Sequence, residues 1–176
     1  MAIVLDIIGS LAIRGAIVLV MLRLNVSLQQ TLYLKTANAN VRSNLATLVA
    51  IIETDFRQLG YGASTTPFLV SDSSNVKFIA DFSNNGTIDS VYYYLTGTEV
   101  YRRYNSTSAV RIGRGVTQFK FEYYNVSGVQ TAVLDDVVSV KLSVAMEENY
   151  LITNSSDGQQ YRPSATSVHQ FFPQNL

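Results

Sequence analysis

The first two dozen residues of the chain form an apolar run that is long enough to cross a bilayer. Residues 3–22 supply roughly the 20 apolar positions that such a span needs, and two charges, Asp6 and Arg14, interrupt them. The run starts without basic residues and is longer than the apolar core of a cleaved secretory signal, so we expect the mature chain to keep it. A plain single-span anchor is the simplest interpretation.

The apolar run continues without a break into an amphipathic segment. No proline and no glycine stands between Gly15 and Gly60, and apolar residues recur at spacings of mostly three or four. Residues 3–59 are therefore predicted to form one helix about 85 Å long, with Gly60 just beyond its C-terminal end. The first half is apolar all round, whereas the second half would pack one face on a following domain. The stripe contains Leu24, Leu28, Leu32, Ala39, Val41, Leu45, Leu48, Ile52, Phe56 and Leu59.

After Gly60 the sequence pattern changes from a helical period to a period of two. Segments rich in β-branched and aromatic residues alternate with turn formers, which implies an antiparallel sheet with one face on the long helix. Residues 161–172 are predicted to be a weak edge strand or an extended tail. The predicted fold class is α+β, with a helical part at 1–60 and a β-rich globular domain at 61–176. The predicted strands cover 76–82, 87–97, 99–105, 116–125 and 137–146.

Composition argues against catalysis and against nucleic-acid binding. The chain has 13 basic and 13 acidic residues, no cysteine and a single histidine, His169, so zinc sites and cysteine or histidine nucleophiles would have almost no side chains to use. Four arginines between positions 102 and 114 lie among tyrosines and could bind single strands, but a solvated β face is the simpler interpretation. The acidic pairs at 135–136 and 147–148 have no histidine beside them. We expect no enzyme activity and no nucleic-acid partner.

A helix longer than its globular part can cover must be buried by lipid or by copies of itself. The order of apolar helix, amphipathic continuation and antiparallel sheet resembles type IV pilins and pseudopilins. The segment IIETDFRQLGYG (51–62), with an acid, an arginine and a glycine-tyrosine pair at the end of the long helix, is similar to minor pilin-like and pseudopilin proteins, as are residues 76–95 and 115–125.

The resemblance also gives a meaning to the N-terminal charges. If Met1 is removed, which the small Ala2 permits, Asp6 becomes the fifth residue, where the family carries an acid. The resemblance implies that this acid meets the free α-amine of a neighbouring subunit inside an apolar filament core, and a buried carboxylate needs such a partner. Arg14 is unusual for the family and could pair with Asp6 of another subunit. Ala2, Asp6 and Arg14 are therefore the predicted assembly residues.

The family carries a basic leader ending in glycine before the apolar run, and no such leader precedes Met1. We expect either a leader that this numbering omits or a different route of maturation.

The resemblance implies a structural subunit that polymerises through its N-terminal helix into an extracellular filament on the cell surface, after waiting in the inner membrane. Its partners would be copies of itself, as a helical homopolymer, and the pilus or secretion assembly machinery. Outward-facing tyrosines, alternating with rings in the core, could form subunit contacts or adhesive patches. Two alternatives stay open: a minor pseudopilin at the tip of a secretion or pilus machine, and a membrane-anchored ligand- or calcium-binding module that never polymerises.

A short motif after the first predicted strand suggests a calcium site. Oxygen-bearing side chains occupy its first, third, fifth and ninth positions, and Gly86 occupies the sixth, as in the early part of a calcium loop. The twelfth position is Tyr92 instead of a bidentate glutamate, and a hairpin turn at 84–86 is the simpler interpretation. The candidate ligands are Asp81, Ser83, Asn85 and Asp89. No other cofactor is expected.

Several N-x-S/T triplets occur in the chain. Those at Asn105 and Asn154 lie in predicted surface loops, where glycans are usually attached. These two asparagines are the candidate glycosylation sites.

Overall fold

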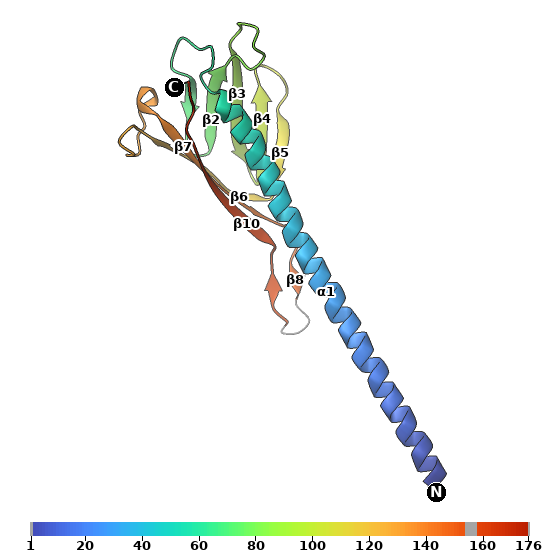
Figure 1. Cartoon of the computed structure of the whole chain (residues 1–176). Helices are drawn as coiled ribbons and strands as arrows, with labels where there is room; N and C mark the ends of the chain where they lie inside the picture. Colours follow the sequence, from blue (N-terminus) through green and yellow to red (C-terminus); the bar gives the residue numbers. More distant parts are fainter. Residues whose placement is uncertain (1, 154–157, 176) are drawn as a thin grey trace.

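The chain folds as one long helix whose second half carries the β-sheets (Figure 1). The computed structural model describes residues 2–153 and 158–175. Helix α1 spans Ala2–Gln58, which confirms the predicted single helix to within one residue at each end. Gly60 follows with a φ of 79°, a left-handed conformation that suits glycine and turns the chain away from the helix.

In the described residues, the strands form three antiparallel sheets. The first sheet has the order β1-β2-β3-β4-β5, the second β10-β7-β6, and the third is the short pair β8-β9. A 3-10 turn, Leu134–Asp136, precedes β7. The strands are β1 Phe68–Ser71, β2 Asn75–Ala80, β3 Asp89–Thr96, β4 Glu99–Tyr104, β5 Val110–Arg114, β6 Val116–Tyr124, β7 Ser139–Glu147, β8 Ile152–Thr153, β9 Gln160–Tyr161 and β10 Ser164–Phe171.

The α+β class and the antiparallel pairing are confirmed, but the strands divide into two main sheets where the sequence predicted one. The division falls at Gly115, which joins β5 of the first sheet to β6 of the second with a φ of 73°. A Cβ at Gly115 would overlap the carbonyl oxygen of Glu147, because the two chain segments lie side by side there as antiparallel neighbours at backbone distance.

Two differences from the expected strands have physical causes. Strand β5 contains Gly113 and has a half-exposed, irregular pattern, so it carries little strand signal. Strand β10 was expected as a weak edge strand or tail and is a full partner of β7, in register from Ser164 opposite Glu147 to Phe171 opposite Val140. Most of its residues are polar and most are exposed, which makes the segment resemble a tail in sequence.

The core lies between the second half of α1 and the two main sheets. Phe56 of α1 stands at its centre, with ring centroids 4.8 Å from Phe78 of β2, 5.9 Å from Phe121 of β6 and 5.1 Å from Phe171 of β10. This cluster fixes the helix to both sheets at once. The buried apolar residues of α1 are Ala37, Val41, Leu45, Leu48, Val49, Ile52 and Phe56.

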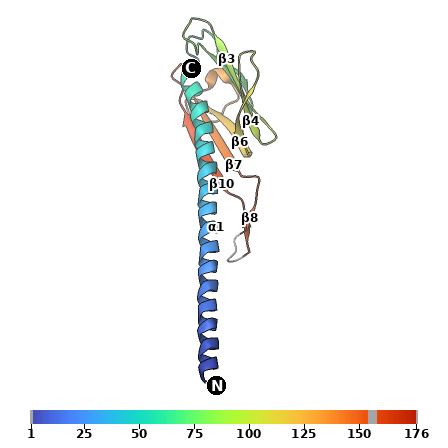
Figure 2. The ribbon, with the colours of Figure 1, turned by 90° about the vertical axis from the view of Figure 1, so that its right-hand side faces the viewer.

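The two halves of α1 therefore have different surroundings. The turned view shows the strands gathered beside the C-terminal half, while the N-terminal half extends beyond them (Figure 2). Descending from the sheets, the segment around β8 and β9 reaches α1, where the rings of Tyr150 and Tyr33 lie 6.2 Å apart. The predicted boundary at residue 60 separates helix from strands in sequence, whereas in space the end of α1 and the strands share one core.

Candidate functional site

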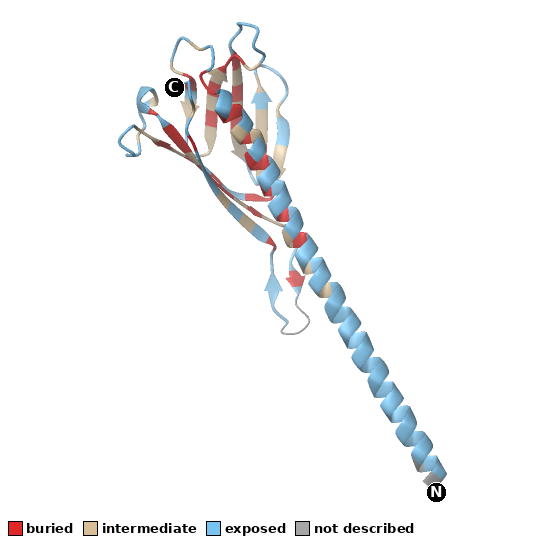
Figure 3. Ribbon diagram, in the orientation of Figure 1, coloured by how far each residue is buried: buried red, intermediate tan, exposed pale blue. Residues whose placement is uncertain are grey.

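The first half of α1 is exposed along nearly all its length (Figure 3). From Ile3 to Tyr33, every large apolar side chain that the structure describes is at least 50% exposed. Among the described residues, α1 alone has the length and apolarity of a membrane span, with a mean hydropathy of 2.0 in its apolar window. A soluble monomer rarely leaves such a continuous apolar surface open, so lipid or protein must cover it.

Two of the predicted assembly residues lie on this surface. The side chains of Asp6 and Arg14 are both exposed, and neither makes an ion pair with another described residue. The side chain of Ala2 lies outside the part of the chain that the structure describes. Arg14 follows Asp6 by eight residues, which places the two about 12 Å apart along the helix axis, too far for contact within one chain.

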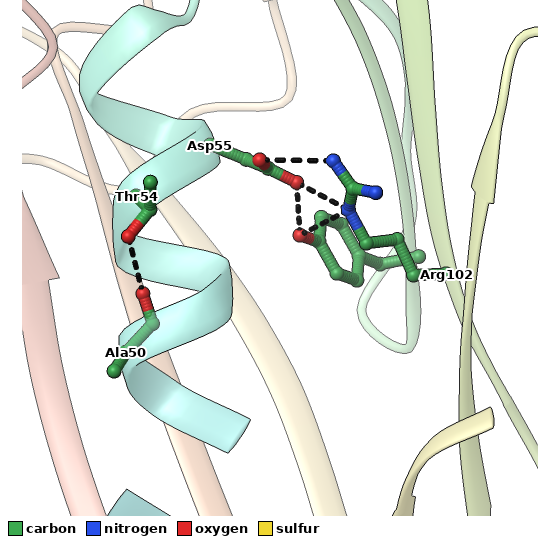
Figure 4. Close-up of polar contacts among 5 residues, drawn as sticks. Ala50, Thr54, Asp55 and Arg102 are labelled. Carbon is green, nitrogen blue, oxygen red and sulfur yellow. Dashed lines mark hydrogen bonds and ion pairs between the residues drawn. The ribbon is translucent and has the colours of Figure 1, made fainter. Parts of the chain in front are cut away.

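At the other end of α1, a buried polar cluster attaches the helix to the first sheet (Figure 4). Asp55 of α1 accepts hydrogen bonds from Arg102 of β4, from Nε at 2.6 Å and from Nη2 at 3.0 Å. The hydroxyl of Tyr93 of β3 also donates to Asp55. Burial, together with the neighbouring carboxylate, raises the pKa of Tyr93, and the hydrogen bond to Asp55 raises the pKa of Arg102. The cluster therefore keeps a neutral phenol and a charged guanidinium around one carboxylate.

The residues of this cluster are not among the predicted sites, although the sequence contains a signal for one of them. Asp55 follows Ile52 by three residues and precedes Phe56, so an acid stands on the apolar stripe of the helix. A buried acid in that position requires a partner from the strands. The sequence alone does not show which of the nearby arginines supplies it.

Of the four arginines of β4 and β5, Arg103, Arg111 and Arg114 are exposed, and only Arg102 is partly buried. Arg102 points inward to Asp55, whereas Arg103 lies over the ring of Tyr92, 5.3 Å from its centroid. Arg111 pairs with Glu99 at 2.6 Å. Arg102, Arg103 and Arg111, which lie close together in the sequence, therefore take part in three separate interactions.

Tyrosines alternate between core and surface on β3, as predicted. Tyr93 is fully buried, while Tyr92 and Tyr94 lie on the outer face of the first sheet. There the ring of Tyr94 stacks on Tyr92, with centroids 5.0 Å apart, and on Tyr101, with centroids 5.5 Å apart. The outer face therefore carries a ladder of rings that cover one another's faces.

Three of the candidate calcium ligands lie in the connection between β2 and β3, and the fourth, Asp89, is the first residue of β3. Asp81 accepts hydrogen bonds from the backbone N–H of Asn85 at 3.0 Å and of Gly86 at 2.7 Å. Asp89 accepts one from the side chain of Asn105 at 2.7 Å and one from the hydroxyl of Ser83 at 3.3 Å. These bonds form a closed turn. Among the described residues no group of three or more His, Cys, Asp or Glu side chains gathers, and calcium binding here stays a prediction.

The two candidate glycosylation sites differ in what the structure says of them. Asn105 is exposed and has a φ of 49°, and its side-chain oxygen accepts a hydrogen bond from the backbone N–H of Ser90 at 2.6 Å. Its side-chain nitrogen, the atom that a glycan would modify, donates to Asp89. Asn154 lies outside the described residues. Modification at either position stays a prediction.

Comparison with known proteins identifies the fold. No protein-family model and no curated protein matches the sequence. Among solved structures, the chain is similar to a type IV-like pilin from Thermus thermophilus, with a TM-score of 0.55 and 13% sequence identity over 77% of this chain and 97% of that chain. Together with the apolar N-terminal helix and the antiparallel sheets, this similarity shows a type IV pilin-like fold.

Proposed function

We propose that the chain is a structural subunit that polymerises through its N-terminal helix into an extracellular, type IV pilus-like filament. The observation that carries the proposal is the uncovered apolar half of α1, from Ile3 to Tyr33, on a chain with a pilin-like fold. Copies of the same helix bury that surface when they pack side by side. The sheets, attached to the C-terminal half, then form the outer layer.

The geometry of this surface favours an open polymer over a closed ring. Apolar side chains surround the helix on every side, so one helix has neighbours in several directions. Contacts between different faces of identical subunits are heterologous, and such contacts produce helical filaments when the rotation does not close. Because each subunit added buries the same apolar surface, growth at the end of the filament remains favourable.

Before assembly, the same half of α1 would lie in the inner membrane. Its length and apolarity suit a single span, and lipid satisfies the same need for burial as neighbouring helices do. Movement from lipid to filament exchanges one apolar environment for another. The partners of the chain would then be its own copies and the machinery that extracts it from the membrane.

Removal of the apolar helix tests the proposal. A chain lacking residues 2–28 keeps Tyr33, at which contacts with the β part begin, and loses most of the uncovered surface. We expect the full chain to form filaments when detergent is removed, and the shortened chain to sediment as a soluble monomer with the same thermal unfolding of its core. Filaments of the shortened chain would overturn the proposal. A full chain that stays monomeric in detergent and in vesicles would instead support a non-polymerising anchored module.

A further inference from the structure

The apolar run at residues 3–22 carries two opposite charges that its own chain does not neutralise. Asp6 is the only acid between residue 2 and residue 52, since the next one along the chain is Glu53. Arg14 lies in the middle of the apolar run, with apolar or small residues on either side. A charge enclosed by packed apolar helices is strongly unfavourable unless it is paired with an opposite charge. Both charges therefore need partners from outside the chain.

The polar residues of the run 3–22 lie on one side of the helix. Apart from glycine, the polar residues in 3–22 are Asp6, Ser10 and Arg14, and four positions separate each from the next. Residues at that spacing lie one above the other on a helix, turning by about 40° at each step. Ser10 satisfies its hydroxyl within the chain by donating to the carbonyl of Ile7 at 3.0 Å. An acid thus stands at one end of a short polar line and a base at the other.

From this arrangement we propose that Asp6 of one subunit forms an ion pair with Arg14 of a neighbouring copy. The proposal rests on the proposed function and specifies its contact. Parallel helices bring the two side chains to the same height when one helix is displaced by eight residues, about 12 Å, along the axis. Every subunit inside the filament then gives its acid to one neighbour and its base to another, and both charges are neutralised throughout the core.

Small residues between the two charges and just beyond Arg14 let the helices come close enough for the pair. Gly9 and Gly15 have open space where a side chain would stand, and Ala12 and Ala16 add little bulk. Close approach matters because the aspartate side chain is short. The α-amine of a neighbour would satisfy Asp6 but would leave Arg14 without an acid, because the first 52 residues of a neighbouring helix offer no acid besides Asp6.

Charge reversal tests the pair in the full chain. Asp6→Arg gives a subunit with two bases, and Arg14→Asp gives one with two acids. We expect each variant alone to lose filament mass at least tenfold, and an equal mixture of the two to recover it, because position 6 of each variant then finds the opposite charge at position 14 of the other. Single variants that assemble like the natural chain, or a mixture that assembles no better than either variant, would overturn the pair while leaving the filament proposal in place.

Cross-linking gives a second test that needs no charged variant in the membrane. The chain has no cysteine, so Asp6→Cys combined with Arg14→Cys introduces two unique thiols. They lie about 12 Å apart within one chain, beyond the roughly 7 Å between Cα atoms that a disulfide spans, so oxidation can link them only between subunits.

Oxidised filaments of this double variant should give a ladder of covalent oligomers. The matched control joins Asp6→Cys and Val18→Cys to Arg14→Ala, so that the same two charges are removed while the second thiol lies one helical turn farther along, and it should give no ladder. A ladder of equal strength from the control, or none from the 6–14 variant, would overturn the proposed stagger. Natural-sequence chains that form no filaments at all would instead refute the proposed function.

Discussion

Asp55 of α1 and Arg102 of β4 form a two-point ion pair that ties the long helix to the first sheet. The guanidinium donates to both carboxylate oxygens, at 2.6 Å and 3.0 Å, and the hydroxyl of Tyr93 completes the cluster. The apolar core attaches the same helix to both sheets, but apolar contacts tolerate small sliding movements. The ion pair fixes the height and rotation at which the β part is held, and hence the surface that a filament would display.

Loss of this pair should weaken the core attachment. We expect Asp55→Ala to lower the free energy of unfolding by about 2–3 kcal/mol, because it leaves a partly buried guanidinium and a buried hydroxyl without their acceptor. The value lies below that of a fully buried pair since the Arg102 side chain is 28% exposed. Urea unfolding of the chain lacking residues 2–28 measures it.

A matched control lies two residues away on the same helix. Arg57 pairs with Glu53 at 2.7 Å, but its side chain is 76% exposed. Arg57→Ala should change the unfolding free energy by less than about 0.5 kcal/mol. Equal effects of the two variants would mean that the buried pair contributes no more than a surface one.

The junction between the two main sheets should be sensitive to a single methyl group. We expect Gly115→Ala to destabilise the fold by about 3 kcal/mol, because it combines a left-handed backbone with overlap of the Glu147 carbonyl. Gly128→Ala has a similar φ of 72° but open space around it, and should cost about 1 kcal/mol. Thermal unfolding of both variants gives the comparison. Similar losses of stability in the two variants would show that the left-handed backbone, and not the close approach of the Glu147 carbonyl, makes position 115 intolerant of a side chain.

The turn between β2 and β3 should show a pH signature. A hydrogen bond to Asp89 raises the pKa of Tyr104 to about 12, and the same bond, followed by that from Asn105, lowers the pKa of Asp89. Asp89→Asn should therefore bring the pKa of Tyr104 back toward its ordinary value near about 10. Titration of the tyrosine side chains by NMR follows this change directly, and an unchanged Tyr104 would contradict the contact.

The same carboxylate fixes the sign of the acid response. Because the pKa of Asp89 is lower in the folded chain than in the unfolded one, its contribution is present above the ordinary pKa of an aspartate and is lost as the pH falls below it. We expect the melting temperature to fall as the pH drops through that region, and to fall less in Asp89→Asn. A steeper fall of the melting temperature in the variant would contradict the lowered pKa of Asp89.

The sequence predicted those parts of the fold that rest on periodicity. Because the helical period runs without interruption from residue 3 to residue 59, a single helix is the structure to expect, and the structure has one at Ala2–Gln58. The division of the strands into two sheets could not be predicted, because it depends on a close backbone approach between Gly115 and Glu147, which are far apart in sequence. The strand character of β10 is weak in the sequence for a related reason. Its pairing with β7 stabilises it as a strand more than its own alternation of apolar and polar residues does.

The two ends of α1 show that functional residues, too, are easier to predict when they depend on the local sequence than when they depend on distant partners. Asp6 and Arg14 could be selected from the sequence because a charge in an apolar run is conspicuous whatever its partner. Asp55 was overlooked because it is one acid in a charged, amphipathic segment, and its importance appears only when Arg102 and Tyr93 are brought to it by other strands. A single sequence shows where a partner is needed more readily than which residue provides it.

Electron cryomicroscopy of filaments from producing cells tests the central claim most directly. We predict a helical polymer of this chain with residues 3–33 packed in parallel at its centre and the two main sheets on its outside. Filaments in which α1 faces solvent or lipid, or preparations in which the full chain is present only as membrane-bound monomers, would contradict the account.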